Sequence, residues 1–343
     1  MAAGRLRTMI ATAGMLLVLS LPPGATRPAL AESGEVRFAQ LYGLTYLPAY
    51  VVYEQKLIEK HAERLGIPAP KVTQAKLSSG PASNDALLAG SVDIAMGGIT
   101  VLMTMWDKTK GSLNVRGVTA LCESPIYLLT VDPRIKSVKD FREGDRIAVS
   151  AVKVTLQALF LNLAAAREWG WDQRFKLDPL AVSMSHPLSV AALRSANLEV
   201  KSYAAIVPYN YEVLANKNAR QLMTSYDVLG GAHSTGAMWA TETWVKANPK
   251  TYQAVVAAFE EAMGLIAADR DAVARTYVKW EKSTLPVAEV ARILSNPDDI
   301  TFSATPRRSM AIAETMHKVG LLKSQPSAWT DYFHSALHGR KGS

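Results

Sequence analysis

Uncharged polar residues and glycines stand at several points where a predicted strand gives way to a predicted helix. The clearest case is residues 78–106, SSGPASNDALLAGSVDIAMGGITVLMTMW. Pro81 opens a short helix there, and Val92–Met96 forms a short buried strand that leads into a second helix. The free N–H groups near Ser79–Ser83 and Gly98–Thr100 attract anions, and glycine lets a ligand approach the backbone closely. The same pattern also suits a helix–strand connection that binds nothing.

Three other predicted strand-to-helix turns offer similar groups. The loop Leu41–Pro48 lies between a first strand, Glu35–Gln40, and a helix expected over Ala49–Ile58, and its tyrosines either line a ligand site or cover the sheet edge. Ser150–Thr155 precedes a long helix, and Ser183–Pro187 precedes another. The histidine in that last turn, His186, suits either a ligand contact or a hydrogen-bonded turn. The expected chemistry is binding through neutral donors and helix dipoles.

The elements that position these turns alternate between strand and helix. Residues 35–106 read strand-helix three times over, which predicts a parallel sheet with right-handed crossovers. Residues of about 124–223 read as a second α/β unit. After Gly230-Gly231 we expect helices to the end of the chain, including an alanine-rich one over Tyr252–Ala268. The length also favours two lobes over one compact core.

The N-terminal residues predict a cleavable signal peptide. Arg5 and Arg7 precede an apolar run, Met9–Leu21, which is too short to span a bilayer, and Ala29-Leu30-Ala31 is a small-x-small cleavage site. We expect cleavage after Ala31 and a periplasmic location. Removing three arginines lowers the net charge from +8 to +5. No basic cluster with interleaved aromatic residues indicates nucleic-acid binding.

Catalysis and metal binding find little support in the motifs. The chain has no G-x-S-x-G, no P-loop and no G-x-G-x-x-G after a strand. Cys122 is its only cysteine and lies in an apolar strand-like run, so we expect a buried core residue. His233 sits at a predicted lobe crossing, and the four remaining histidines are expected at the surface. We therefore predict no enzyme, no cofactor and no metal site.

In its order of motifs, the chain resembles the substrate-binding proteins of bacterial ABC importers for nitrate, taurine and aliphatic sulfonates, a family that includes binders of thiamine-pyrimidine precursors. The resemblance covers essentially all of residues 35–335. It rests on these segments: Leu41–Pro48, Asn84–Gly98 (NDALLAGSVDIAMGG), Ser124–Thr130, Ser137–Asp140, Val190–Ser195, Pro208-Tyr209, Pro249–Met263 and Lys318–Phe333 (KVGLLKSQPSAWTDYF).

The resemblance implies an α/β type II periplasmic-binding-protein fold with two lobes, a hinge, a cleft and a helical C-terminal tail. Lobe 1 would comprise residues 32–123 and 229–343, and lobe 2 residues 124–228. Carried over position by position, the implied ligand-binding residues are Tyr42, Thr45, Tyr46, Ser79, Gly80, Gly98, Thr100, Ser124, Val152, Thr155, His186 and Tyr209.

The resemblance also implies a function. The protein would be a periplasmic receptor that captures a small organic or inorganic anion, such as a sulfonate, taurine or nitrate, and delivers it as a monomer to an inner-membrane permease. Because Tyr42, Tyr46 and Tyr209 could also enclose a ring, an aromatic or heterocyclic solute is an alternative. A ligand-sensing adaptor with the same fold is a third reading.

Overall fold

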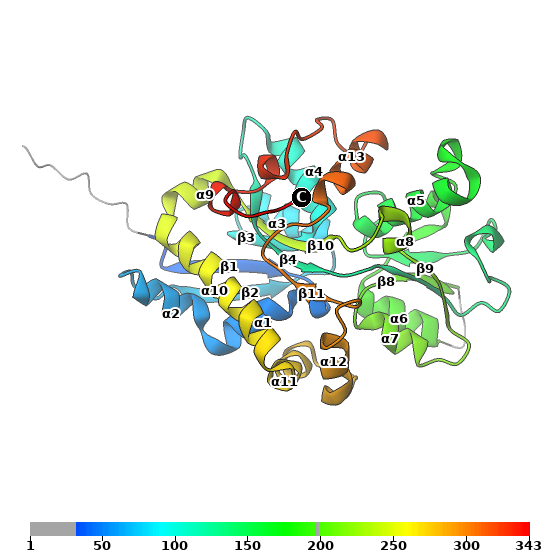
Figure 1. Ribbon diagram of the computed structural model, residues 1–343, viewed down its shortest axis with the longest axis horizontal. Helices are drawn as coiled ribbons and strands as arrows, with labels where there is room; N and C mark the ends of the chain where they lie inside the picture. Colours follow the sequence, from blue (N-terminus) through cyan, green and yellow to red (C-terminus); the bar gives the residue numbers. More distant parts are fainter. Residues whose placement is uncertain (1–31, 196–198) are drawn as a thin grey trace, which may run out of the picture. The chain divides into compact units, whose positions relative to one another are not determined.

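Two mixed β-sheets organise the chain in a computed structural model, which describes residues 32–195 and 199–343. The predicted signal peptide lies outside the described residues. We call the part built on the first sheet lobe one and the part built on the second sheet lobe two (Figure 1). None of the helices in these described ranges is long and apolar enough to cross a membrane.

The first sheet has the order β11-β4-β10-β3-β1-β2. β1 pairs in parallel with β2 and β3, as the strand-helix alternation predicts, whereas β10 runs antiparallel between β3 and β4. The ends of β1 and β3 therefore meet at one edge of the sheet. Its strands are β1 (Glu35–Gln40), β2 (Lys71–Lys76), β3 (Ile94–Gly98), β4 (Arg116–Glu123), β10 (Ser234–Ala240) and β11 (Thr301–Phe302).

The second sheet has the order β7-β6-β8-β5-β9. β6 pairs in parallel with β7 and β8, and β5 runs antiparallel between β8 and β9. The chain thus passes between sheets twice, after β4 and after β9. The strands are β5 (Tyr127–Thr130), β6 (Ile147–Val149), β7 (Ala181–Ser183), β8 (Ser202–Ala205) and β9 (Arg220–Thr224).

Helices cover both sheets (Figure 1). In lobe one, α10 packs against α1 and α2, while α3 and α4 pack against β3. The helices of lobe one are α1 (Leu47–Gln55), α2 (Leu57–Arg64), α3 (Gly80–Leu88), α4 (Ile99–Thr109), α9 (Glu242–Ala247), α10 (Pro249–Ala268), α11 (Arg270–Glu281), α12 (Val287–Leu294) and α13 (Ser309–Lys318). Those of lobe two are α5 (Leu156–Trp169), α6 (His186–Arg194), α7 (Tyr209–Leu214) and α8 (Tyr226–Leu229).

The mixed α/β architecture with a largely helical C-terminal region confirms the predicted fold class, and Cys122 lies buried in β4 as expected. The lobe boundaries at 123/124 and 228/229 stay a prediction, although the strands of the two sheets fall on either side of them.

Three local expectations are wrong. The chain after Gly231 is not only helical, because β10 lies at the centre of the first sheet with all seven residues buried. Its mixed sequence, STGAMWA, has no alternation, and Gly236 is needed because a Cβ there would lie 2.4 Å from Thr45 Cγ2. The helix expected over 49–58 is divided into α1 and α2 at Lys56, whose φ is 53°. His334, expected at the surface, is buried.

Candidate functional site

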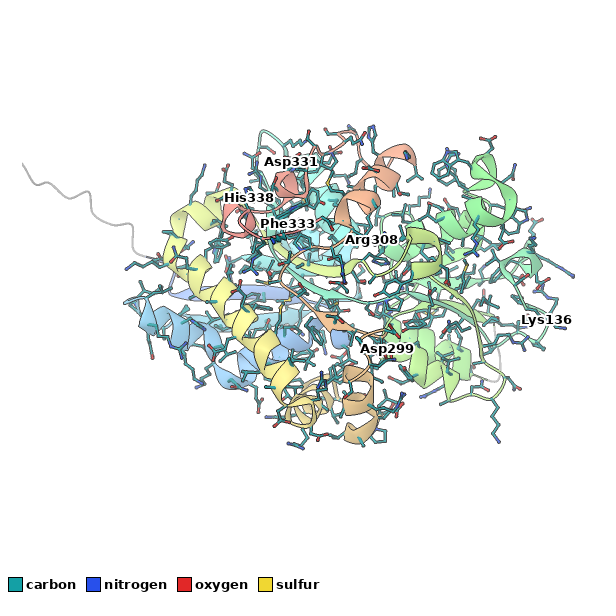
Figure 2. All side chains as sticks on the ribbon, in the orientation of Figure 1. Lys136, Asp299, Arg308, Asp331, Phe333 and His338 are labelled. Atoms are coloured by element: carbon teal, nitrogen blue, oxygen red, sulfur yellow. The ribbon has the colours of Figure 1, made fainter. Side chains whose placement is uncertain are left out.

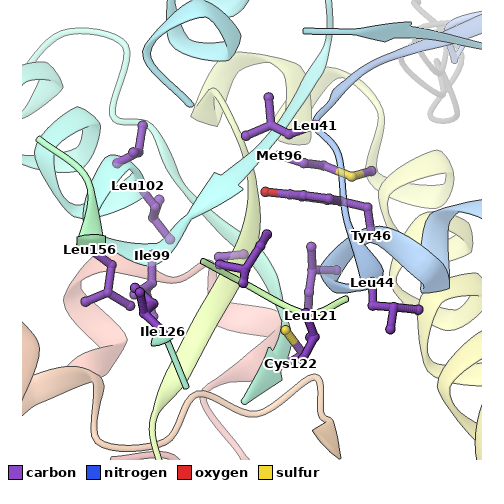
Figure 3. Packing of buried hydrophobic residues seen from close by; sticks show 14 of the residues in the cluster. Leu41, Leu44, Tyr46, Met96, Ile99, Leu102, Leu121, Cys122, Ile126 and Leu156 are labelled. Atoms are coloured by element: carbon purple, nitrogen blue, oxygen red, sulfur yellow. The ribbon is translucent and has the colours of Figure 1, made fainter. Parts of the chain in front are cut away.

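A small cavity lies where the two lobes meet, and strand ends and helix starts from both lobes line it. Its volume is about 50 Å³. Leu41 and Thr45 contribute from the loop after β1, which includes the short 3-10 turn Leu44–Tyr46. Ile126 and Leu156 contribute from lobe two and belong to the same buried cluster as Ile99 of lobe one (Figure 3).

Four helices begin at the small cavity, two from each lobe. The first residue of α3, Gly80, lines it, as does Gly98, the residue that precedes α4. From lobe two, Thr155 precedes α5, and His186 is the first residue of α6. Each helix is at least nine residues long, so each brings a partial positive charge and unpaired N–H groups.

Side chains leave most of these helix starts uncapped. Thr155 caps α5 by accepting a hydrogen bond from Ala158 N, but no side chain caps α3, α4 or α6. Gly80 is required for packing, since a Cβ there would lie 2.8 Å from Val101 Cγ2. Gly98 has space for a side chain, with its nearest neighbours 3.8–3.9 Å from an added Cβ.

No aspartate, glutamate, lysine or arginine lines the small cavity among the described residues. His186 is buried, and this burial lowers its pKa from 6.5 to about 4, so the ring is neutral at neutral pH. Its Nδ1 shares a hydrogen bond with the hydroxyl of Tyr203. The local field therefore comes from helix dipoles and neutral donors, which favour an anion and need no buried counter-ion.

A second, large cavity of about 620 Å³ also spans the two lobes. Unlike the small cavity, it carries charges of both signs. Glu281 is its most buried carboxylate, with 4% of the side chain exposed, and pairs with Lys76. The residues that line the large cavity include Tyr42, Arg194, Tyr209, Glu212, Glu281, Lys282 and Thr284.

Stacked rings separate the two cavities. His186, which lines the small cavity, stacks on Tyr209, which lines the large one, with ring centroids 5.5 Å apart and planes within 12°. The hydroxyl of Tyr209 donates to Glu281 Oε1 at 2.9 Å. Tyr209 therefore connects lobe two to lobe one.

Further hydrogen bonds join the lobes and hold them closed. Leu44 N donates to Val207 O at 3.2 Å, and Thr284 Oγ1 donates to Glu212 Oε2 at 3.2 Å. Asp299, labelled in Figure 2, accepts from the hydroxyl of Tyr127 in lobe two at 2.6 Å. These contacts place the protein in a conformation in which residues of both lobes line the small cavity.

The structure brings six of the twelve predicted ligand-binding residues to the small cavity: Thr45, Tyr46, Gly80, Gly98, Thr155 and His186. Tyr42 and Tyr209 line the large cavity instead. The other four line neither cavity. Ser79 precedes α3, Thr100 is buried in the first turn of α4, Ser124 Oγ donates to Asp299 O, and Val152 N donates to Ser183 Oγ.

The other eight residues of the small cavity are not among the twelve predicted ligand-binding residues. Ser150 begins the predicted turn at 150–155, and Leu156 and Gln157 follow it, so that turn was the available signal. Thr235 belongs to β10, the strand that the sequence did not reveal. The full set is Leu41, Val101, Ile126, Ser150, Leu156, Gln157, Ile206 and Thr235.

The three tyrosines proposed to enclose a ring do not share a cavity. Tyr46 lines the small cavity and is buried, whereas Tyr42 and Tyr209 line the large one. Tyr209 already stacks on His186. The arrangement therefore offers no sandwich of these three rings.

Solved structures of solute-binding proteins share this fold. The alkanesulfonate-binding protein of Xanthomonas axonopodis, bound to MOPS, has a TM-score of 0.66 at 20% identity, covering 86% of this chain and 96% of that protein. The aliphatic sulphonate-binding protein of Escherichia coli has a TM-score of 0.64 at 18% identity, with 89% and 99% covered. The periplasmic nitrate-binding protein of Synechocystis has a TM-score of 0.69 at 16% identity, with 88% and 84% covered.

This likeness is one of fold, and it includes sulfonate- and nitrate-binding proteins of the family that the sequence motifs resemble. No protein-family model matches the chain, and no curated protein matches it.

Proposed function

We propose that this protein is the periplasmic solute-binding receptor of an ABC importer and that its solute is a small anion. The observation that carries the proposal is the convergence of four helix N-termini, two from each lobe, on one cavity that no charged side chain lines among the described residues. Helix starts from both lobes would stabilise a negative charge bound at such a site.

The size of the small cavity narrows the class of anion. A cavity of about 150 Å³ holds benzene, and the small cavity is about 50 Å³. A compact anion such as nitrate, or the head of a short alkyl sulfonate, fits this volume, whereas an aromatic ring does not. We therefore place the inorganic anion and the short sulfonate ahead of a heterocycle.

Closure of the lobes is the mechanism that we assign to this site. An open form would expose each pair of helix starts to solvent, and an anion bound between the pairs would favour the closed form through its greater affinity for that form. The hydrogen bonds from Tyr209 to Glu281 and from Thr284 to Glu212 form only when the lobes meet. The closed form would then be the state that docks on the permease, and no chemical step is required of the protein.

A thermal-shift screen of residues 32–343 tests the proposal. The panel holds sodium salts of nitrate, methanesulfonate, taurine and MOPS, with sodium chloride as the ionic-strength control and thiamine precursors as neutral or cationic heterocycles. We expect stabilisation by the smallest anions, about 2.7 kcal/mol at a hundredfold excess over Kd. Stabilisation by heterocycles alone would contradict the anion assignment.

A further inference from the structure

An exposed aromatic cluster lies at the far end of α5 from the small cavity. Gly170, with φ at 89°, ends the helix, and the chain continues into a short 3-10 turn, Trp171–Gln173. Trp171 is 41% exposed and Phe175 is 40% exposed. Among the described residues they are the only aromatic side chains in the set of large apolar groups exposed to this degree.

Cations accompany these rings. The guanidinium carbon of Arg174 lies 4.4 Å from the ring centre of Phe175 and 5.1 Å from that of Trp171. Lys176 Nζ lies 4.4 Å from the ring centre of Trp169. Contacts of this kind orient a cation at the edge of an apolar surface and leave its outer face for an anion.

In the part of the chain that the structure describes, no carboxylate is ion-paired with these two cations. Within residues 32–195 and 199–343, neither Arg174 nor Lys176 forms an ion pair. Of the nearby acids, Glu168 is paired with Lys139 at 3.3 Å, and Asp172 is exposed. The Nε atom of Arg174 is buried without a hydrogen-bond partner. With Asp172 counted against Arg174 and Lys176, the segment Trp169–Lys176 carries a net charge of +1 beside its two exposed rings.

From this combination we infer that Trp169–Lys176 is a membrane-contact segment that binds the surface of an anionic lipid bilayer. Tryptophan and phenylalanine place apolar rings at the boundary between headgroups and acyl chains, and arginine and lysine pair with anionic headgroups. The inference does not depend on which solute the small cavity holds. Contact at one segment would keep the protein near the membrane without a spanning helix.

Flotation with lipid vesicles tests the inference. The full mature chain is mixed with vesicles of phosphatidylglycerol and phosphatidylethanolamine, or with vesicles of phosphatidylcholine alone, at low and at high salt. We expect binding to the anionic vesicles that weakens with salt. Equal binding to neutral vesicles, or none to anionic ones, would overturn the inference.

Paired variants separate the segment from the general positive charge of the protein. Trp171→Ser with Phe175→Ser should weaken vesicle binding at least about tenfold, because the exposed ring surface is lost. Arg174→Gln with Lys176→Gln should weaken it about tenfold or more, since each cation near an anionic surface is worth roughly fivefold. A drop of the same size in the charge control, Lys217→Gln with Lys323→Gln, would show attraction by net charge alone and refute the segment.

The exposed apolar control is Leu188→Ser with Leu214→Ser, which lies elsewhere on lobe two and should bind vesicles like the unchanged protein. A second copy of this protein, instead of a membrane, could cover the aromatic cluster. Sedimentation of the unchanged chain and of the variant with both aromatic substitutions tests this alternative. If the unchanged protein dimerises and this variant does not, the cluster is a contact between two copies, and the membrane inference is wrong. Melting temperatures of all variants verify that they fold.

Discussion

The two cavities between the lobes differ in charge and in size. The small cavity is about 50 Å³ and is lined by uncharged groups at four helix starts. The large cavity is about 620 Å³ and carries Arg194, Glu212, Glu281 and Lys282. Its carboxylates already have partners: Glu281 accepts from Gly43 N and Tyr209, and Glu212 accepts from Thr284.

The proposed binding site is therefore the smaller of the two cavities, and it is chosen on its helix starts and not on its volume. The two carboxylates of the large cavity accept hydrogen bonds across the lobes, Glu281 from Tyr209 and Glu212 from Thr284, so they help to hold the closed form together. The small cavity has little volume, but three of its four helix starts have no side-chain cap. The free N–H groups at these uncapped helix starts can donate hydrogen bonds to a ligand, and they lie at the small cavity.

The largest expected effect comes from placing a carboxylate in the small cavity. Gly98 precedes α4 with φ and ψ of −68° and 148°, a conformation that any residue adopts, and an added Cβ meets no atom closer than 3.8 Å. Gly98→Asp should therefore cap α4 and occupy the anion position, lowering anion affinity at least a thousandfold, about 4 kcal/mol. Calorimetric titration measures the affinity.

Gly98→Asn is the matched control, because it caps the helix and fills similar volume without the negative charge. It should retain measurably more anion binding than the aspartate variant. If both variants bind the anion as tightly as the unchanged protein, the solute does not occupy the small cavity, and the comparison fails.

The next effect concerns the large cavity. Glu281→Gln leaves Lys76 without its carboxylate and should lower the free energy of unfolding by about 3 kcal/mol, at the low end for a buried pair because 24% of the Lys76 side chain is exposed. Urea denaturation measures this. The variant with both Glu281→Gln and Lys76→Met should recover part of the loss, and strictly additive losses would show that the pair is not coupled.

The pH dependence of stability should have opposite signs in the two cavities. Burial lowers the pKa of His186 to about 4, so between pH 6.5 and 4 the unfolded chain binds more protons, and stability falls on acidification by about 1.4 kcal/mol per pH unit. Burial raises the pKa of Glu212 above 4.5, so its contribution is present at low pH and lost as pH rises through the folded pKa.

Urea titrations at several pH values between 4 and 7 distinguish these contributions. His186→Gln should flatten the loss of stability in acid, and Glu212→Gln should steepen it. His233 and His334 are buried with pKa values lowered to about 4, so a part of the acid dependence should persist in the His186 variant. If stability depended on pH in the same way in both variants, the prediction that His186 and Glu212 contribute with opposite signs would be wrong.

The smallest effect is expected at the rim of the large cavity. Arg194 has 47% of its side chain exposed, its Nη1 lies 3.9 Å from the Glu212 carboxylate, and its Nη2 donates to Glu212 O at 3.0 Å. Because the arginine is exposed to solvent, Arg194→Gln should change the free energy of unfolding by less than about 1 kcal/mol. Anion affinity should also stay within about twofold by titration calorimetry. A tenfold loss would show that the solute reaches the large cavity and uses this cation.

The strand-helix alternation was enough to predict the parallel part of the first sheet and the helix starts at Gly80 and Gly98. Pro81 and the neighbouring glycines set these helix starts locally, because where a helix begins depends on the backbone conformation of a few adjacent residues. β10 was not predictable in this way. Its residues are buried on both faces between β3 and β4, so they show neither alternation nor turn signals.

The candidate site, like the fold, was predictable from the sequence only in part. The sequence by itself determined that the predicted turns carry neutral groups at helix starts, since no arginine occurs in those turns and the glycines and hydroxyls precede helices. Only the tertiary structure decided which starts meet. It put Thr45 and His186 in one cavity but moved Tyr42 and Tyr209 to another. This outcome depends on the approach of the two lobes, made by contacts between residues far apart in the sequence such as Leu44 and Val207, and on the stacking of His186 on Tyr209.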